Sequence, residues 1–236
     1  MKQKKCFAIL LLCALTAFHI LWDRQFSSTD SSDFVPVLPE PVIQINAMEQ
    51  TPNPLILHAS YACLMDAGSH RILYSKNTDK KVPMASTTKI MTALLALEEE
   101  NCHERFIVDS EANRVEGTSM GLKEGDEASL YDLAGGMLAA SGNDGANAAA
   151  VKIAGSIEAF AEKMNEKAAA LSMHSTHFVT PSGLHDEAHY STAADMALLA
   201  RAALKNEDFA ALCSQKSVQL YYGNPPYTRT LSNHNR

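Results

Sequence analysis

The chain begins with an apolar run unlike anything that follows it. Three lysines among the first five residues precede an almost uninterrupted apolar stretch from Phe7 to Trp22. A basic start followed by a short apolar run is typical of an export signal. The run is shorter than the roughly 20 apolar residues that a bilayer-spanning helix needs. We therefore predict that residues 1–22 are a signal peptide or an N-terminal anchor rather than the first helix of a core.

The next segment, 23–54, is polar and rich in proline. It contains the serine-rich run 27–33 and five prolines between positions 36 and 54. A segment of this composition cannot bury enough apolar surface to offset the entropy lost on ordering. We predict a disordered linker.

Regular hydrophobic patterning starts near residue 55. Two short apolar runs, 61–65 and 71–74, flank a turn-like segment and predict a β-hairpin. The segment 86–97 is helical by propensity and apolar on nearly every side, which indicates a helix buried in the core. Further predicted elements are helices at 129–140, 144–154, 156–171 and 192–204, and a possible strand at 217–222. Ser129 and Asp132 resemble a capping box at the start of the first of these helices. We expect residues 55–236 to form one α+β domain.

Composition narrows the class of protein. The 236 residues are 46% hydrophobic and 20% charged, which excludes a wholly disordered chain. The formal net charge of −7 offers no basic surface for nucleic acid. Five cysteines without a C-x-x-C pair predict neither a disulfide framework nor a zinc ribbon. We expect Cys63, Cys102 and Cys213 to be small buried apolar residues rather than ligands.

A serine and a lysine three residues apart open the predicted buried helix. Ser86 and Lys89 are neighbours on a helix surface, so the amine can reach the hydroxyl. A serine needs a base to become a nucleophile, and a lysine can serve once burial lowers its pKa. The N-terminal end of a helix also favours developing negative charge. By itself the pattern is more simply explained as a serine cap followed by an exposed lysine.

A second polar pattern follows about fifty residues later. Ser141-Gly142-Asn143 separates two apolar helices and supplies a hydroxyl that can relay a proton and an amide that can donate and accept hydrogen bonds. Alone, these residues are ordinary for a turn between helices. At this distance from S-x-x-K, however, S-x-N is the second motif of penicillin-binding proteins and class A β-lactamases.

Three segments, 84–98, 141–147 and 190–197, together resemble the low-molecular-weight penicillin-binding proteins, the serine-type D-alanyl-D-alanine carboxypeptidases. The resemblance implies a β-lactamase/transpeptidase-like α+β fold, with a five-stranded antiparallel sheet and a helical cluster. It implies that Ser86 is the acylated nucleophile, Lys89 its proton acceptor, Ser141 a second proton-handling group and Asn143 a substrate-binding amide. No metal or cofactor is implied.

The resemblance also implies a substrate and a location. The expected reaction removes the terminal D-alanine from peptidoglycan stem peptides outside the cytoplasm, and β-lactams are the expected inhibitors. We expect no nucleic-acid partner, and membrane contact only through the N-terminal segment or a C-terminal region not present here. The third motif of the family, Lys-Thr-Gly, does not occur in the sequence. We therefore expect a truncated domain, and the alternative is an impaired fragment or a non-catalytic wall-binding scaffold of the same fold.

Two alternative hypotheses about the class of enzyme rest on different residues. A class A β-lactamase needs a Glu with an Asn four residues later, and only Glu49 and Asn53 in the linker fit. A zinc peptidase would need ligands from a group of four histidines. We expect that group to lie on the surface instead; it comprises His174, His177, His185 and His189.

Overall fold

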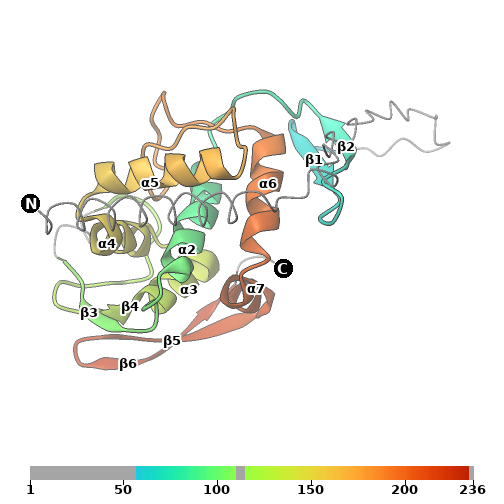
Figure 1. Ribbon diagram of the computed structural model, residues 1–236. Helices are drawn as coiled ribbons and strands as arrows, with labels where there is room; N and C mark the ends of the chain where they lie inside the picture. The colour runs from blue at the N-terminus through green and yellow to red at the C-terminus, as the bar shows by residue number, and fades with distance from the viewer. Residues whose placement is uncertain (1–56, 110–114, 234–236) are drawn as a thin grey trace, which may run out of the picture. The chain divides into compact units, whose positions relative to one another are not determined.

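The computed structural model describes residues 57–109 and 115–233 (Figure 1). Contacts divide the chain into Met1–Thr51 and Pro52–Arg236, and every described residue belongs to the second unit. The predicted export segment, the linker and the Glu49–Asn53 pair lie outside the described residues, so those interpretations stay predictions. Among the helices that are described, none combines the length and hydropathy needed to cross a bilayer.

Helices surround one central helix, α2 (Lys89–Glu98). Four apolar side chains of α2 are almost completely buried, at Met91, Ala93, Leu94 and Ala96, which confirms the predicted core helix. It packs against α3 (Leu130–Ala140), α4 (Asn143–Ala154), α5 (Ile157–Ala170), α6 (Ala193–Ala203) and α7 (Glu207–Ser214). The four later helices that the sequence predicts are confirmed within one residue at most ends. Helix α7, only eight residues long, was not predicted.

The strands form two antiparallel sheets. The predicted hairpin is β1 (Ala62–Met65) paired with β2 (Ile72–Lys76). A second sheet has the order β3-β4-β5-β6, with β3 at Arg105–Ile107, β4 at Glu127–Ser129, β5 at Ser217–Gly223 and β6 at Pro226–Ser232. The α+β class is confirmed.

The single five-stranded sheet implied by the resemblance is not what the described residues form. Among the described residues, β1 and β2 pair with each other and with no other strand, and β1 packs on α6. The four-stranded sheet packs on α3 instead, through β5 and β6 (Figure 1). The two sheets therefore rest on different helices and share no ladder of hydrogen bonds.

Strand β5 shows why the second sheet lies on α3. Val218, Leu220 and Tyr222 alternate with exposed residues and are buried, as expected for a strand with one face on the core. Leu220 lies so close to α3 that a Cβ on Gly135 would be 2.5 Å from its Cδ2. The glycine thus allows close approach of strand and helix.

The start of α3 is fixed by the predicted capping box. The Ser129 hydroxyl accepts from the Asp132 N–H at 3.1 Å, and the Asp132 carboxylate accepts from the Ser129 N–H at 3.2 Å. A cap of this kind contributes about 1 kcal/mol and defines where the helix begins. Helix α3 ends at Ala140, and its C-cap is Ser141, the first residue of the second motif.

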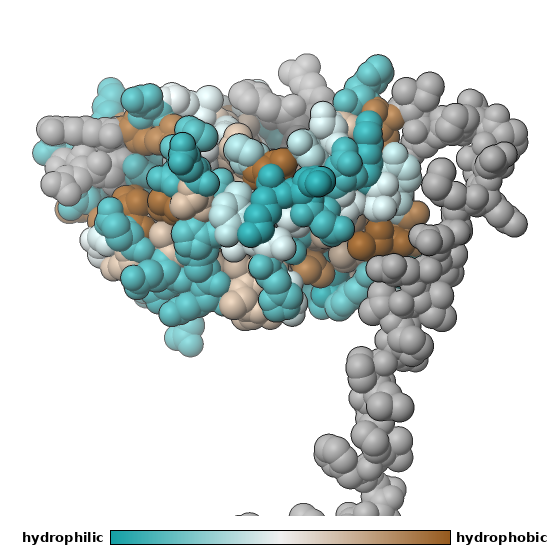
Figure 2. All heavy atoms as spheres, turned by 90° about the horizontal axis from the view of Figure 1, so that it is seen from above, coloured by the Kyte–Doolittle hydropathy of each residue, from teal (hydrophilic) through white to brown (hydrophobic). Residues whose placement is uncertain are grey.

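Exposed apolar side chains concentrate on the β1–β2 hairpin. Leu64, Ile72 and Leu73 are 56%, 47% and 51% exposed. Elsewhere, on the face drawn in Figure 2, apolar residues appear in small groups separated by hydrophilic ones. The hairpin therefore buries much less of its apolar surface than β5 does.

Candidate active site

Ser86 and Lys89 are brought together at the entrance to α2. Ser86 lies in a short 3₁₀ turn, η1 (Ala85–Thr88), which runs directly into α2 at Lys89. The predicted α-helix from Ser86 is therefore a 3₁₀ turn at its first residues, and Ser86 does not act as a side-chain cap. Because side chains at i and i+3 eclipse in a 3₁₀ turn, the geometry suits the pair. The Lys89 Nζ donates to the Ser86 Oγ at 3.2 Å.

The two side chains differ in their exposure to solvent. Ser86 is exposed and can meet a substrate, whereas Lys89 is only 2% exposed. Burial lowers the pKa of Lys89 from 10.5 to about 8, and the nearby Asp144 carboxylate opposes part of that shift. A useful fraction of Lys89 is therefore neutral near pH 7 and can accept a proton. The alternative of an exposed lysine beside a serine cap is wrong.

A loop from a distant part of the sequence completes the lysine's surroundings. The Ser182 carbonyl accepts from Lys89 Nζ at 2.7 Å, and the Pro181 carbonyl accepts from the Thr92 hydroxyl at 2.7 Å. Gly183 adopts a φ of +84°, and a Cβ there would lie 1.9 Å from the Ala85 carbonyl oxygen. Only glycine lets this loop approach the turn that carries Ser86.

Ser141 and Asn143 occupy the junction between α3 and α4. Ser141 is the C-cap of α3 in a left-handed conformation, with φ +56°, and Asn143 is the first residue of α4. The buried Asn143 amide donates to the Glu116 carbonyl, and the Asn143 N–H donates to the Thr118 carbonyl at 2.8 Å. Among the described residues, no hydrogen bond joins Ser141 Oγ to Ser86 or Lys89. The structure thus places these two residues at the junction of two helices that pack on α2, without a hydrogen bond to the pair among the described residues.

Asp144 links this junction to Lys89. Its buried carboxylate accepts from the Ser119 hydroxyl at 2.6 Å and from the N–H groups of Met120, Gly121 and Leu122 at 2.9–3.0 Å. These bonds hold the loop before β4 against α4 and keep a negative charge in the site. Its place in the segment 141–147, directly after the second motif, was the only sequence signal for Asp144, and no role was predicted for it.

The four histidines do not assemble a metal site. His174, His177 and His185 are exposed as expected, but His189 is only 3% exposed, so its assignment to the surface was wrong. Its ring nitrogens are occupied by Thr88 and by two backbone N–H groups, which explains why it can be buried. The hydrogen bonds also show that His189 belongs to the framework of the site.

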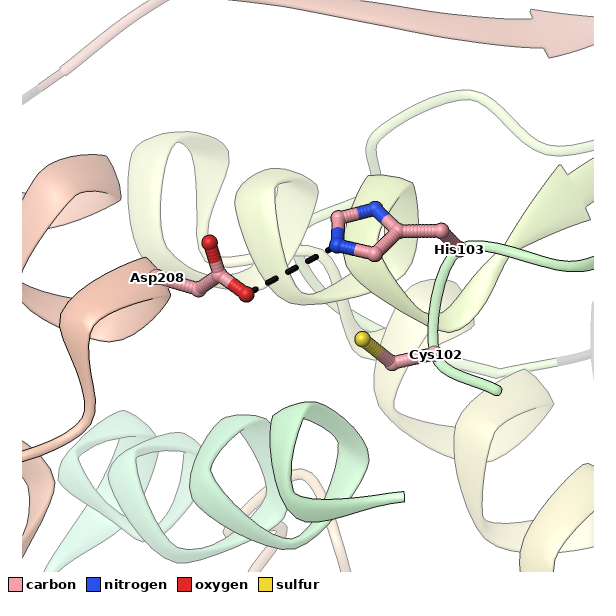
Figure 3. A group of neighbouring side chains, drawn as sticks. All are labelled: Cys102, His103 and Asp208. Carbon is pink, nitrogen blue, oxygen red and sulfur yellow. Dashed lines mark ion pairs between the residues drawn. The ribbon is translucent and has the colours of Figure 1, made fainter. Parts of the chain in front are cut away.

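One different group has the spacing of metal ligands within the described residues. Figure 3 shows Cys102 and His103, from the turn after α2, facing Asp208 of α7, with ligand atoms within 4.8 Å of one another. Burial and the Asp208 carboxylate raise the pKa of the Cys102 thiol, which disfavours the thiolate that metals bind. His103 is 66% exposed and pairs with Asp208 at 3.7 Å. This group lies at the opposite end of α2 from Ser86 and takes no part in the site.

The three described cysteines are free thiols. Cys102 is buried as predicted, whereas Cys63 and Cys213 are half-buried.

A helical cluster on antiparallel strands, with a serine beside a buried lysine of lowered pKa, defines a class of acyl-transfer enzyme. Residues 47–236 match the peptidase S11 family model, described as D-alanyl-D-alanine carboxypeptidase. The chain belongs to this family.

Relatives and solved structures agree with the family model. The D-alanyl-D-alanine carboxypeptidase DacF of Bacillus subtilis is 39% identical over 154 residues, covering 63% of this chain and 40% of the relative. A crystal structure of a D-alanyl-D-alanine carboxypeptidase from Mycobacterium tuberculosis has a TM-score of 0.70 at 32% identity, covering 75% of this chain and 67% of that one. Penicillin binding protein 6B from Escherichia coli has a TM-score of 0.69 at 33% identity, with 79% and 61% covered.

The chain spans 40%, 53% and 46% of the length of three curated relatives that it matches.

Proposed function

We propose that the protein is a serine-type D-Ala-D-Ala carboxypeptidase that trims the terminal D-alanine from peptidoglycan stem peptides. The observation that carries the proposal is the contact between Ser86 Oγ and Lys89 Nζ at 3.2 Å, with the lysine pKa lowered to about 8. It supports the proposal because membership of the family supplies the reaction and this pair supplies its nucleophile and base.

In the proposed first step, neutral Lys89 accepts the proton of the Ser86 hydroxyl. The oxygen attacks the carbonyl carbon between the two D-alanines, and the C–N bond breaks as the amine takes up a proton. The products are an acyl ester on Ser86 and free D-alanine. Water then hydrolyses the ester and regenerates the hydroxyl.

Ser141 and Asn143 are proposed to serve the same step. The hydroxyl of the half-buried Ser141, at the end of α3, can pass a proton between Lys89 and the leaving amine. Asn143 Oδ1 accepts no hydrogen bond from a described residue, so it can accept one from a substrate N–H while its amide nitrogen remains bound to Glu116. The side-chain amide would thus orient the peptide and hold the loop at the same time.

A purely wall-binding scaffold fits these observations less well. Burying an ammonium group costs free energy, and a protein that only binds gains nothing from it. Lys89 at 2% exposure, directed at an exposed serine, is the arrangement that catalysis needs.

The proposed location is outside the cytoplasm, in the cell envelope. The basic start and apolar run of residues 1–22 support export, and peptidoglycan is found on that side of the membrane. β-Lactams are the proposed inhibitors, because they present a strained amide to the same serine.

The test is covalent labelling of the full-length protein with penicillin, followed by mass spectrometry of the labelled peptide. We expect one adduct, on Ser86, and none in the folded Ser86→Ala variant. Release of D-alanine from a D-Ala-D-Ala peptide should be lost in the same variant. An adduct on another residue, or none on the folded wild-type protein, would exclude Ser86 as the nucleophile.

A further inference from the structure

His189 is a buried histidine with every ring nitrogen in use. Its Nε2 lies 2.8 Å from the Thr88 Oγ1, and its Nδ1 accepts from the N–H groups of Val179 and Thr180 at 3.0 and 3.3 Å. An acceptor Nδ1 cannot carry the proton, so the neutral ring carries it on Nε2 and donates it to Thr88.

The electrostatic surroundings favour the same neutral form. Burial lowers the pKa of His189, the Asp186 carboxylate opposes that shift, and His177 adds to it. Protonation of Nδ1 would also set an N–H group against two backbone N–H groups.

The ring joins two segments that meet only at the active site. Thr88 is the last residue of η1 and directly precedes Lys89. Val179 and Thr180 lead into the loop whose Ser182 carbonyl holds the Lys89 ammonium. His189 therefore ties the start of the loop to the residue that directly precedes Lys89, across more than 90 residues of sequence.

Two further contacts hold the loop, one on each side of Ser182, but neither involves the residue that directly precedes Lys89. Thr92 bonds to Pro181 one turn further along α2, and Gly183 abuts the Ala85 carbonyl on the far side of Ser182. Without His189 the segment entering the loop would lose its hydrogen-bonded link to Thr88, and we expect water to reach the ammonium.

We propose that His189 is a positioning residue for the Ser86–Lys89 pair: through Thr88 and the 179–183 loop it keeps Lys89 dry and aimed at Ser86, without touching substrate. The consequence for catalysis rests on the proposed function. The expected effect on the pKa of Lys89 does not rest on that function, because it follows from the burial of the ammonium group alone.

The first experiment measures the pKa of Lys89 directly. The Cε resonances of ¹³C-lysine-labelled protein are followed against pH by NMR, with Lys89 assigned by its loss in the folded Lys89→Arg variant. In the wild-type protein we expect a midpoint near 8. In His189→Ala, hydration of the ammonium should raise that midpoint by about one unit or more. A role in stability alone would lower the melting temperature and leave the midpoint unchanged.

Variants at Thr88 provide matched controls. Thr88→Ser keeps the hydroxyl that accepts from His189 and should retain the wild-type midpoint. Thr88→Val is nearly isosteric but removes the acceptor, so it should shift the midpoint in the same direction as His189→Ala. It also keeps the test open if His189→Ala does not fold, because the comparison of Thr88→Val with Thr88→Ser then decides it.

The second experiment follows acylation by penicillin against pH. The acidic limb of the rate profile should move to higher pH together with the Lys89 midpoint. An unchanged midpoint in folded His189→Ala and Thr88→Val would overturn the inference. If the midpoint shifts but the wild-type protein is never acylated, the positioning role stands and the proposed function fails.

Discussion

At the scale of single residues, the site depends on a buried cation. Lys89 has one hydroxyl and one carbonyl as partners, and the Asp144 charge is near enough to act on it. These contacts offset only part of the cost of burial, which is why its pKa falls. The cost of burying the ammonium group lowers the pKa of Lys89, which lets it act as a base, and it also lowers the stability of the folded protein.

Because burial lowers both the pKa of Lys89 and the stability of the fold, we predict that the difference in stability between the wild-type protein and Lys89→Met depends on pH. Between pH 8 and 10.5 the unfolded lysine binds a proton that the folded one does not, so wild-type stability rises with pH. The full shift corresponds to about 3 kcal/mol. The free energy of unfolding of Lys89→Met, relative to that of wild type, should therefore be most favourable at pH 7. It should fall by up to that amount by pH 10.5. The loss of the partner of the Ser182 carbonyl is a constant offset at every pH.

Urea denaturation of both proteins at several pH values measures this difference, because other titrating groups cancel between them. Acylation should be abolished in Lys89→Met throughout. Parallel stability profiles from pH 7 to 10.5 would show that the lysine has an ordinary pKa.

At the scale of elements, the site forms where η1 packs against the 179–183 loop. The loop crosses the turn at Gly183, where backbone lies against backbone. The distance between the Ser182 carbonyl and Lys89 depends on that close approach. A side chain at position 183 would separate the two elements and remove the carbonyl from the lysine.

Gly183→Ala should therefore lower the free energy of unfolding by much more than the strain of a left-handed backbone alone explains. Gly155, at the end of α4, has nearly the same φ, +81° against +84°, but a Cβ there meets nothing within 4 Å. Gly155→Ala thus reports the backbone strain, about 1 kcal/mol. Gly183→Ala should lose about 3 kcal/mol or more and should not be acylated. Equal losses in chemical denaturation would mean that the loop can move away without consequence.

At the scale of the whole molecule, sequence predicts what is local. The Ser86–Lys89 contact spans three residues, and the capping box at Ser129 likewise, so spacing alone was enough. The Ser182–Lys89 and His189–Thr88 bonds span 93 and 101 residues, and only the folded chain shows them. Strands β3 and β4, three residues each, are too short to show a period. His189 was placed on the surface because nothing in its neighbours indicates burial.

The uneven burial across the molecule leads to a last prediction, concerning native-state hydrogen exchange. Amides in α2 and β5 lie among fully buried side chains such as Leu94, Leu220 and Tyr222, whereas β1 and β2 present Leu64 and Leu73 to solvent. Local opening is least costly where little apolar surface is lost. Both hairpins are antiparallel, but β5 also pairs with β4 at Gly223 and the β1–β2 register is irregular at Met65, so the comparison is made between amides of β1 and β5 away from those two points.

After correction for intrinsic exchange rates, we expect β1 amides to exchange faster than β5 amides by about two orders of magnitude or more. Amides of α2 should be at least as protected as those of β5, because the helix that carries Lys89 lies at the centre of the core. Equal protection in β1 and β5 would mean that the hairpin unfolds only with the whole domain, and that its exposed leucines do not reflect a weakly held element.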